Sequence, residues 1–147
     1  MATERATSLV AKPLPTITRR RSPVQGYGIF ATQAINKNAR VVDYAGELVR
    51  NGKACEAREE RYMKHDCVWV FRVNRAWSRD AHVGGNISRF INHSCSPNCW
   101  VDIGADKTIW IRASRTIYPG EELTYNYSID GELTIPCRCR PGCPNMI

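Results

Sequence analysis

The sequence contains no run of apolar residues that approaches the roughly 20 needed to cross a bilayer as a helix. Its first 22 residues also lack the continuous apolar stretch of a secretory signal, because Glu4 and Lys12 interrupt it. Internal repeats and low-complexity segments are absent too, and the length of 147 residues suits a single domain. We therefore expect an intracellular protein of the cytoplasm or of the nucleus or nucleoid, without membrane contact.

Acidic residues are outnumbered, with 14 Asp and Glu against 21 Lys and Arg, which gives a net charge of +7. Residues 1–22 hold five of the basic residues and a single acidic one, so more than half of the excess lies there. We expect residues 1–16 to form a flexible basic arm. Such an arm suits nucleic acid or another acidic partner through attraction to phosphate, although a solubilising leader would have the same composition.

A closed disulfide framework is not expected, because the seven cysteines are an odd number. Three of them, Cys137, Cys139 and Cys143, crowd a C-terminal tail that has almost no apolar residues, so burial alone would not order it. Zinc bound by four thiolates would supply the missing stability, on the order of 10 kcal/mol. Cys95 or Cys99, in the segment NHSCSPNC, would complete the four ligands; the alternative is a set of reduced, metal-free thiols.

What the chain does contain is a series of short segments rich in β-branched and aromatic residues, separated by turn residues. These segments predict strands at residues 17–21, 28–32, 40–49, 67–73, 98–104 and 108–113. Helix formers and opposite charges three and four apart predict a helix over residues 51–65, and a second, short helix is expected over residues 85–92. The fold class is therefore mostly β.

Two further segments carry residues that suit a binding or catalytic site. In QGYGIF, residues 25–30, two glycines allow the backbone to approach a ligand, although a simple turn would also explain them. The third glycine of a dinucleotide-binding motif is missing.

In GEELTYNY, residues 120–127, strand alternation places Tyr125 and Tyr127 on one face, either as packing residues or as catalytic ones. A nucleophilic pair of Cys95 with His93 lacks a visible orienting group.

Taken in order, these motifs resemble a known family. GYGIF, DYAGELV, RDAHVGGNISRFINHSCSPNC, GEELTYNY and CRCRPGC are similar to the successive motifs of a SET domain followed by its cysteine-rich post-SET segment. The resemblance spans about residues 17–144, and RFINHSC followed by ELTYNY and a CxC tail is its most specific part. It implies several small antiparallel sheets, few short helices and a C-terminal pseudoknot, with a SET domain at residues 17–130 and a zinc-binding tail at residues 131–147.

SET domains are protein-lysine methyltransferases that use S-adenosylmethionine, and the resemblance assigns roles to residues of this chain. The implied cofactor-binding residues are Gly26, Tyr27, Gly28, Trp69, Arg89, Asn92, His93 and Tyr127. The implied zinc ligands are Cys95, Cys137, Cys139 and Cys143, which leaves Cys99 structural. Tyr127 and Tyr125 would be catalytic, with Tyr44 as a weaker candidate for the lysine channel. Because a hydroxyl at Tyr125 crowds the amine, we expect mono- or dimethylation.

Three features depart from the family pattern. The last two cysteines of the tail are separated by three residues instead of the usual four, and Asn126 replaces the more frequent Asp. No cysteine-rich segment precedes the domain, so a minimal, stand-alone enzyme is expected. The substrate would be a histone or histone-like protein with a target lysine. The alternative is an inactive module that binds lysine-containing peptides or chromatin, but the retained tyrosines and RFINHSC segment favour the enzyme.

Overall fold

A computed structural model describes residues 13–127 and 137–145, and all structural statements below concern these residues. The strands are β1 (Ile17–Arg21), β2 (Tyr27–Ala31), β3 (Arg40–Asp43), β4 (Glu47–Arg50), β5 (Val70–Arg72), β6 (Trp77–Asp80), β7 (Asn92–His93), β8 (Cys99–Ile103), β9 (Ile109–Ala113) and β10 (Thr124–Tyr125). The helices are α2 (Lys53–Met63) and the 3-10 helix η1 (Ile87–Phe90). The expected mostly-β class is confirmed. Neither of these helices has the length and apolar character needed to span a bilayer.

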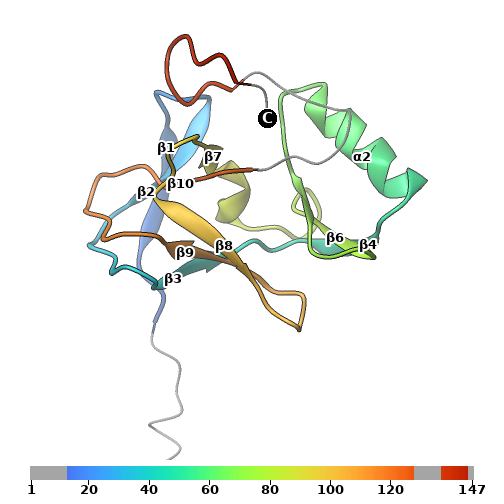
Figure 1. Cartoon of the computed structure of the whole chain (residues 1–147), viewed down its shortest axis with the longest axis horizontal. Helices are drawn as coiled ribbons and strands as arrows, with labels where there is room; N and C mark the ends of the chain where they lie inside the picture. Colours follow the sequence, from blue (N-terminus) through green and yellow to red (C-terminus); the bar gives the residue numbers. More distant parts are fainter. Residues whose placement is uncertain (1–12, 128–136, 146–147) are drawn as a thin grey trace, which may run out of the picture.

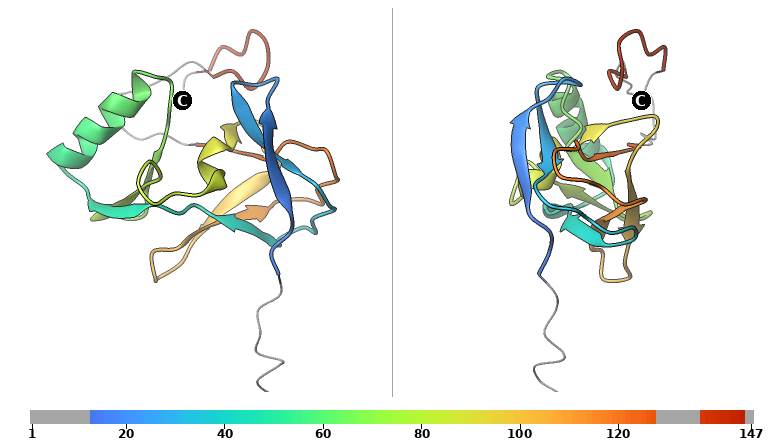
Figure 2. Two further views of the ribbon diagram at one scale, coloured as in Figure 1. Left: turned by 180° about the vertical axis from the view of Figure 1, so that it is seen from behind. Right: turned by 90° about the vertical axis from the view of Figure 1, so that its left-hand side faces the viewer.

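The strands form four small sheets. Three are antiparallel, with the strand orders β1-β2, β3-β9-β8 and β4-β6-β5, and the fourth pairs β7 with β10 in parallel. The β1-β2 ribbon and α2 lie at opposite ends of the molecule (Figures 1 and 2). The predicted short helix is η1, whose first turn is capped by Asn86, because its side-chain oxygen accepts a hydrogen bond from the backbone N–H of Ser88 at 3.0 Å.

The segment predicted as one strand over residues 40–49 is divided between two sheets, β3 and β4. The backbone N–H of Tyr44 still donates to the backbone oxygen of Ile109 in the β3-β9-β8 sheet. The backbone N–H of Glu47 donates to the backbone oxygen of Val83, beside the β4-β6-β5 sheet. Between them Gly46 passes so close to Asp80 that a Cβ on Gly46 would lie 2.5 Å from the backbone oxygen of Asp80. The predicted single strand is therefore interrupted at Gly46, where the backbone passes close to the backbone of Asp80 in β6.

A buried carboxylate fastens α2 to the β4-β6-β5 sheet. Asp80 has no exposed surface, and its Oδ2 accepts hydrogen bonds from Arg58 at 2.9 Å and from the hydroxyl of Tyr62 at 2.7 Å. Its Oδ1 accepts from the backbone N–H of His82 at 2.9 Å. Because all three donors converge on one side chain, the position of α2 depends on Asp80.

We expect Asp80→Asn to lower the free energy of unfolding by about 2 kcal/mol, because hydrogen bonds to a buried charged group are lost or weakened. Urea denaturation followed by circular dichroism measures this. Asp102→Asn is the matched control, since Asp102 pairs with Arg112 on the surface, and its loss should cost less than about 1 kcal/mol. Equal losses in the two variants would contradict the anchoring role of Asp80.

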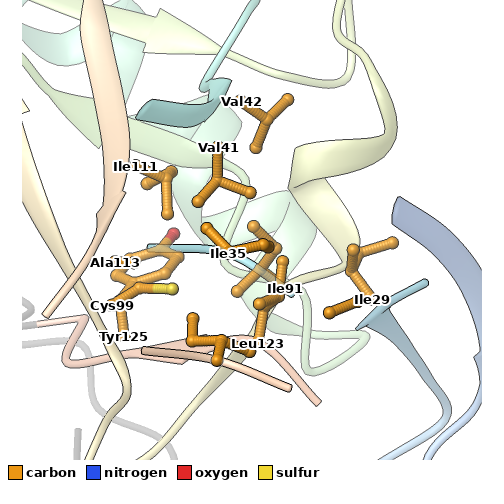
Figure 3. Close-up of a cluster of buried hydrophobic side chains, with 12 residues drawn as sticks. Ile29, Ile35, Val41, Val42, Ile91, Cys99, Ile111, Ala113, Leu123 and Tyr125 are labelled. Carbon is orange, nitrogen blue, oxygen red and sulfur yellow. The ribbon is translucent and has the colours of Figure 1, made fainter. Parts of the chain in front are cut away.

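The main hydrophobic core joins the β1-β2 ribbon to the central sheet. Its fully enclosed members come from β2, β3, β8, β9 and β10 and from the connections between strands; Figure 3 labels Ile29, Ile35, Val41, Val42, Ile91, Cys99, Ile111, Ala113, Leu123 and Tyr125. Cys99 is 2% exposed and lies in this cluster, which agrees with the structural role that the sequence left to it. Tyr125 belongs to this core and also lines a cavity.

The parallel pairing of β7 with β10 brings the two most specific motifs together. Thr124 lies opposite Asn92 and Tyr125 opposite His93, and the backbone N–H of Ser94 donates to Tyr125 at 3.2 Å. This is the pairing that the expected pseudoknot requires, since it places the segment ELTYNY beside RFINHSC.

Candidate active site

Two cavities share a wall, and residues of β7 line one of them while Tyr125 of β10 lines the other. The smaller has a volume of about 270 Å³ and the larger about 1180 Å³. Four residues line both cavities, namely Cys67, Val68, Trp69 and Tyr127. A reaction between two ligands, one in each cavity, would therefore take place beside Tyr127.

The smaller cavity contains most of the residues that the sequence assigned to the cofactor. Its lining includes Gly26, Tyr27, Trp69, Arg89, Asn92, His93 and Tyr127, together with His65, Asp66 and Arg138. Gly28 is not part of this lining. Instead, a Cβ on Gly28 would lie 2.3 Å from the Oε2 atom of Glu122, so this glycine makes room for a carboxylate.

Asn92 and Glu122 hold the glycine turn against β7. The side-chain amide of Asn92 donates to the backbone oxygens of Gln25 at 3.2 Å and Tyr27 at 3.0 Å, and to Glu122 at 2.9 Å. Ser22 donates its hydroxyl to the same carboxylate at 2.8 Å. Sequence reasoning missed Glu122, because strand alternation placed it on the face opposite the tyrosines and its partners Ser22 and Asn92 are distant in sequence.

His93 links the smaller cavity to the cysteine cluster. Its Nδ1 accepts a hydrogen bond from the backbone N–H of Tyr127 at 3.0 Å, and its Nε2 lies 3.5 Å from the sulfur of Cys95. Burial lowers the pKa of His93 below its ordinary value, so the imidazole is neutral at pH 7. A neutral ring is required here, because a protonated Nδ1 would have no lone pair for Tyr127.

The two tyrosines of ELTYNY lie with their ring centroids 5.0 Å apart. The hydroxyl of Tyr127 donates to the backbone oxygen of Ile91, and Tyr125 lines the larger cavity. Burial raises the pKa of both phenols well above the ordinary value near 10, so neither is a phenolate at neutral pH. These hydroxyls can orient a ligand by hydrogen bonding, but they are poor bases.

Trp69 lies on the wall between the cavities, where two neighbouring side chains contact its ring and a third donates a hydrogen bond to its backbone. Its ring stacks on His82 with a centroid distance of 5.2 Å and an interplanar angle of 9°, and the guanidinium of Arg89 lies 5.2 Å from its centroid. The hydroxyl of Tyr44 donates to the backbone oxygen of Trp69 at 2.8 Å. Tyr44 lines neither cavity in this structure and supports Trp69 from the core.

The four predicted zinc ligands converge. The sulfurs of Cys95, Cys137, Cys139 and Cys143 all lie within 4.8 Å of one another, and those of Cys95 and Cys137 are 3.6 Å apart. Zinc–sulfur bonds of about 2.3 Å in a tetrahedron separate the sulfurs by about 3.8 Å, so this set fits a zinc ion. A hydrogen bond from the backbone of Cys95 lowers the pKa of Cys139 to about 7, which favours the thiolate that a metal binds.

The tail that carries three of these cysteines also reaches the smaller cavity. Arg138 lines that cavity and forms an ion pair with Asp66 at 3.4 Å. The spacing of three residues between the last two cysteines does not prevent their convergence, because Gly142 takes a left-handed conformation with φ of 71°. Residues 128–136, which connect the tail to β10, lie outside the described residues.

Comparisons with known proteins agree with this geometry. Residues 26–128 match the family model described as the SET domain. The chain is 41% identical over 132 residues to "Histone-lysine N-methyltransferase trr" of Drosophila melanogaster, covering 85% of this chain and 5% of that protein. It is 40% identical over 136 residues to "Histone-lysine N-methyltransferase, H3 lysine-4 specific" of Yarrowia lipolytica, covering 86% of this chain and 12% of that protein. It therefore spans only a small part of these relatives.

Two solved structures are similar in fold. One is ctPRC2 in an autoinhibited conformation bound to S-adenosylmethionine, with a TM-score of 0.69 and 28% identity, covering 79% of this chain and 15% of that chain. The other is a humanized mutant of the Chaetomium thermophilum Polycomb Repressive Complex 2 bound to an inhibitor, with a TM-score of 0.66, 28% identity and the same coverage. Because its residues 26–128 match the family model, the chain belongs to the SET domain family.

Proposed function

We propose that this chain transfers a methyl group from S-adenosylmethionine to the side-chain amine of a lysine in a protein substrate. The observation that carries the proposal is the pair of cavities that share Tyr127 and Trp69 as a common wall. A cofactor in one cavity and a lysine entering from the other would meet there. Relatives named as histone-lysine methyltransferases, at about 40% identity, support the same reaction.

The smaller cavity suits S-adenosylmethionine by its chemistry. Arg89 and Arg138 offer guanidinium groups for the carboxylate of the cofactor, and the turn at Gly26 and Tyr27 offers backbone groups for close approach. When bound, the cofactor supplies a methyl group on a positively charged sulfur. Trp69 and Tyr127 would place aromatic rings beside that charge, which is favourable through cation–π attraction.

The lysine amine must lose its proton before it can attack. At pH 7 this costs a free lysine about 4.6 kcal/mol, since its pKa is about 10.4 and each unit is worth 1.36 kcal/mol. Tyr125 is 4% exposed and Tyr127 is half-buried, so an amine between them leaves water, which lowers its pKa. Because both phenols stay protonated, the tyrosines would align the amine and the proton would leave to solvent.

The larger cavity suits a basic polypeptide. Three carboxylates from one face of α2 line it, Glu56, Glu59 and Glu60, and burial and the neighbouring Glu56 raise the pKa of Glu59. Arg72 and Arg75 line the same cavity and offset part of this charge, but the carboxylates of α2 still offer partners for the lysine- and arginine-rich segments that histones carry. We therefore propose a histone substrate, and with it a location at chromatin. Contact of the basic arm with nucleic acid stays a prediction.

Two measurements test the proposed function against the inactive binding module. Isothermal titration should give micromolar binding of S-adenosylmethionine, and radiolabelled cofactor should transfer its methyl group to core histones. Binding of cofactor without transfer to core histones or to a whole-cell lysate would favour the module. Absence of cofactor binding would remove the proposal altogether.

Tyr125→Phe should move the product from mono- and dimethyl-lysine toward trimethyl-lysine. The hydroxyl of Tyr125 occupies space in the buried wall of the larger cavity, and its removal leaves room for an additional methyl group beside the amine. Mass spectrometry of a methylated histone H3 peptide measures the shift. An unchanged product distribution, with turnover retained, would show that Tyr125 does not limit methylation.

A further inference from the structure

Six side chains form a continuous row that runs from β1 to the wall of the active site. Guanidinium groups and aromatic rings alternate along it, in the order Arg21, Tyr27, Arg19, Phe90, Arg89, Trp69. The successive distances from guanidinium carbon to ring centroid are 5.4, 4.7, 4.9, 4.9 and 5.2 Å. We call this row the arginine–aromatic ladder. Arg21, Tyr27 and Arg19 form its outer part on the β1-β2 ribbon, which lies on the outside of the molecule (Figure 2).

The outer part of the ladder is exposed and carries uncompensated positive charge. Arg19 and Arg21 are exposed, and Tyr27 is 43% exposed although it is a large aromatic residue. Within residues 13–127 and 137–145, no carboxylate forms an ion pair with either arginine. They share this with most arginines of the described residues, since Arg58, Arg112, Arg115 and Arg138 are the ones for which an ion pair is found there, but Arg19 and Arg21 also lie side by side on one exposed face. Arg19 and Arg21 therefore lie near aromatic rings and have no carboxylate partner within the described residues.

Period-two alternation explains how the sequence builds this surface. Arg19 and Arg21 are two residues apart on a strand, so both side chains lie on the same face of the ribbon. Tyr27 pairs with Arg21 across the ribbon and lies on that face as well. Arg20 points to the opposite face, where its guanidinium lies 4.2 Å from the ring of Phe30.

From this geometry we propose that the outer ladder is a binding site for a single strand of nucleic acid. Guanidinium groups held near rings can donate to phosphate oxygens, and the exposed part of Tyr27 with its neighbouring arginines offers a surface on which bases can pack. Charge alone would also suit an acidic peptide, but an acidic peptide has no use for the alternating flat surfaces. The inner residues Phe90, Arg89 and Trp69 line the cofactor cavity, so a bound strand would lie at the mouth of that cavity.

The test compares two variants that remove equal charge. Arg19→Ala with Arg21→Ala removes the outer ladder, whereas Arg5→Ala with Lys12→Ala removes the same charge from the basic arm. Fluorescence anisotropy with a labelled deoxythymidine strand of about 12 nucleotides measures the Kd of each. We expect the ladder variant to bind at least about tenfold more weakly than the arm variant. Its salt dependence should also become shallower by about 1.4 in the log–log slope, for two lost phosphate contacts.

Two further measurements make the result specific. Arg19→Lys with Arg21→Lys keeps the charge but not the planar groups, and should recover only part of the affinity. S-adenosylmethionine affinity should be unchanged in the ladder variants, which shows that the fold is intact and separates this site from the proposed enzyme activity. Equal losses in the ladder and arm variants, full recovery with lysine, or equally tight binding of poly-glutamate would each overturn the proposal.

Discussion

Replacing Tyr127 by phenylalanine is expected to lower kcat for methyl transfer at least about tenfold, a loss of about 1.4 kcal/mol of transition-state stabilisation. The hydroxyl donates to the backbone oxygen of Ile91, and the ring lies 5.4 Å from that of His93 on the wall shared by both cavities. Without the hydroxyl the ring keeps its packing but loses the hydrogen bond that fixes its direction. Alignment of amine and methyl group should suffer, while cofactor binding remains.

Titration calorimetry with S-adenosylmethionine and steady-state kinetics on a histone H3 peptide separate these two effects. Tyr118→Phe is the matched control, because Tyr118 is 61% exposed in the turn before β10 and its change should leave kcat unaltered. Because burial keeps Tyr127 protonated, its phenol should not contribute an ionisation to the pH–rate profile near neutral pH. Unchanged turnover in Tyr127→Phe would exclude the catalytic assignment.

Loss of the zinc site is the second change with a large expected effect. Cys143→Ser should remove about one zinc ion per chain and lower the melting temperature, because metal binding to such a cluster contributes on the order of 10 kcal/mol. Cofactor affinity should fall as well. Arg138 of the tail lines the smaller cavity, and His93 lies against Cys95, so both depend on the cluster for their positions.

Zinc content by atomic absorption, with thermal denaturation alongside, measures both parts of this expectation. Cys99→Ala is the control of the same residue type. Cys99 lies in the hydrophobic core, outside the four-cysteine cluster, and burial raises the pKa of its thiol to about 12. The Cys99→Ala variant should therefore keep its zinc ion. A Cys143→Ser variant that retained one zinc ion per chain would refute the four-cysteine site.

Much of the site was predictable because it lies in short, contiguous motifs. Each of these motifs can be identified from a few neighbouring residues: the glycine turn, RFINHSC, ELTYNY and the cysteine tail. In the structure, residues of these motifs line the smaller cavity or form the sulfur cluster. Which of Cys95 and Cys99 joins the tail was open from composition alone. The family resemblance favoured Cys95, and the fold agrees, because the sulfur of Cys95 lies beside those of the tail whereas Cys99 faces the core.

The parts that could not be predicted depend on partners distant in sequence. Strand β6 is a four-residue segment with only one apolar residue, WSRD, and exists because β4 and β5 pair with it on both sides. From the sequence, Asp80 resembles an ordinary surface carboxylate. In the structure it is buried, and Arg58 and Tyr62 of α2 donate hydrogen bonds to it. Glu122 accepts hydrogen bonds from Ser22 and Asn92, which lie 100 and 30 positions earlier in the chain, so no local pattern reveals its role.

The parallel contact between β7 and β10 also has a kinetic meaning. Two strands running in the same direction cannot be joined by a tight turn, so a long stretch of intervening chain must first find its place. Such non-local pairings form slowly during folding, because the entropic cost of closing a large loop comes before the stabilising contacts form. We therefore expect the β7-β10 pair, and with it the wall that Tyr125 and Tyr127 form, to assemble late in folding.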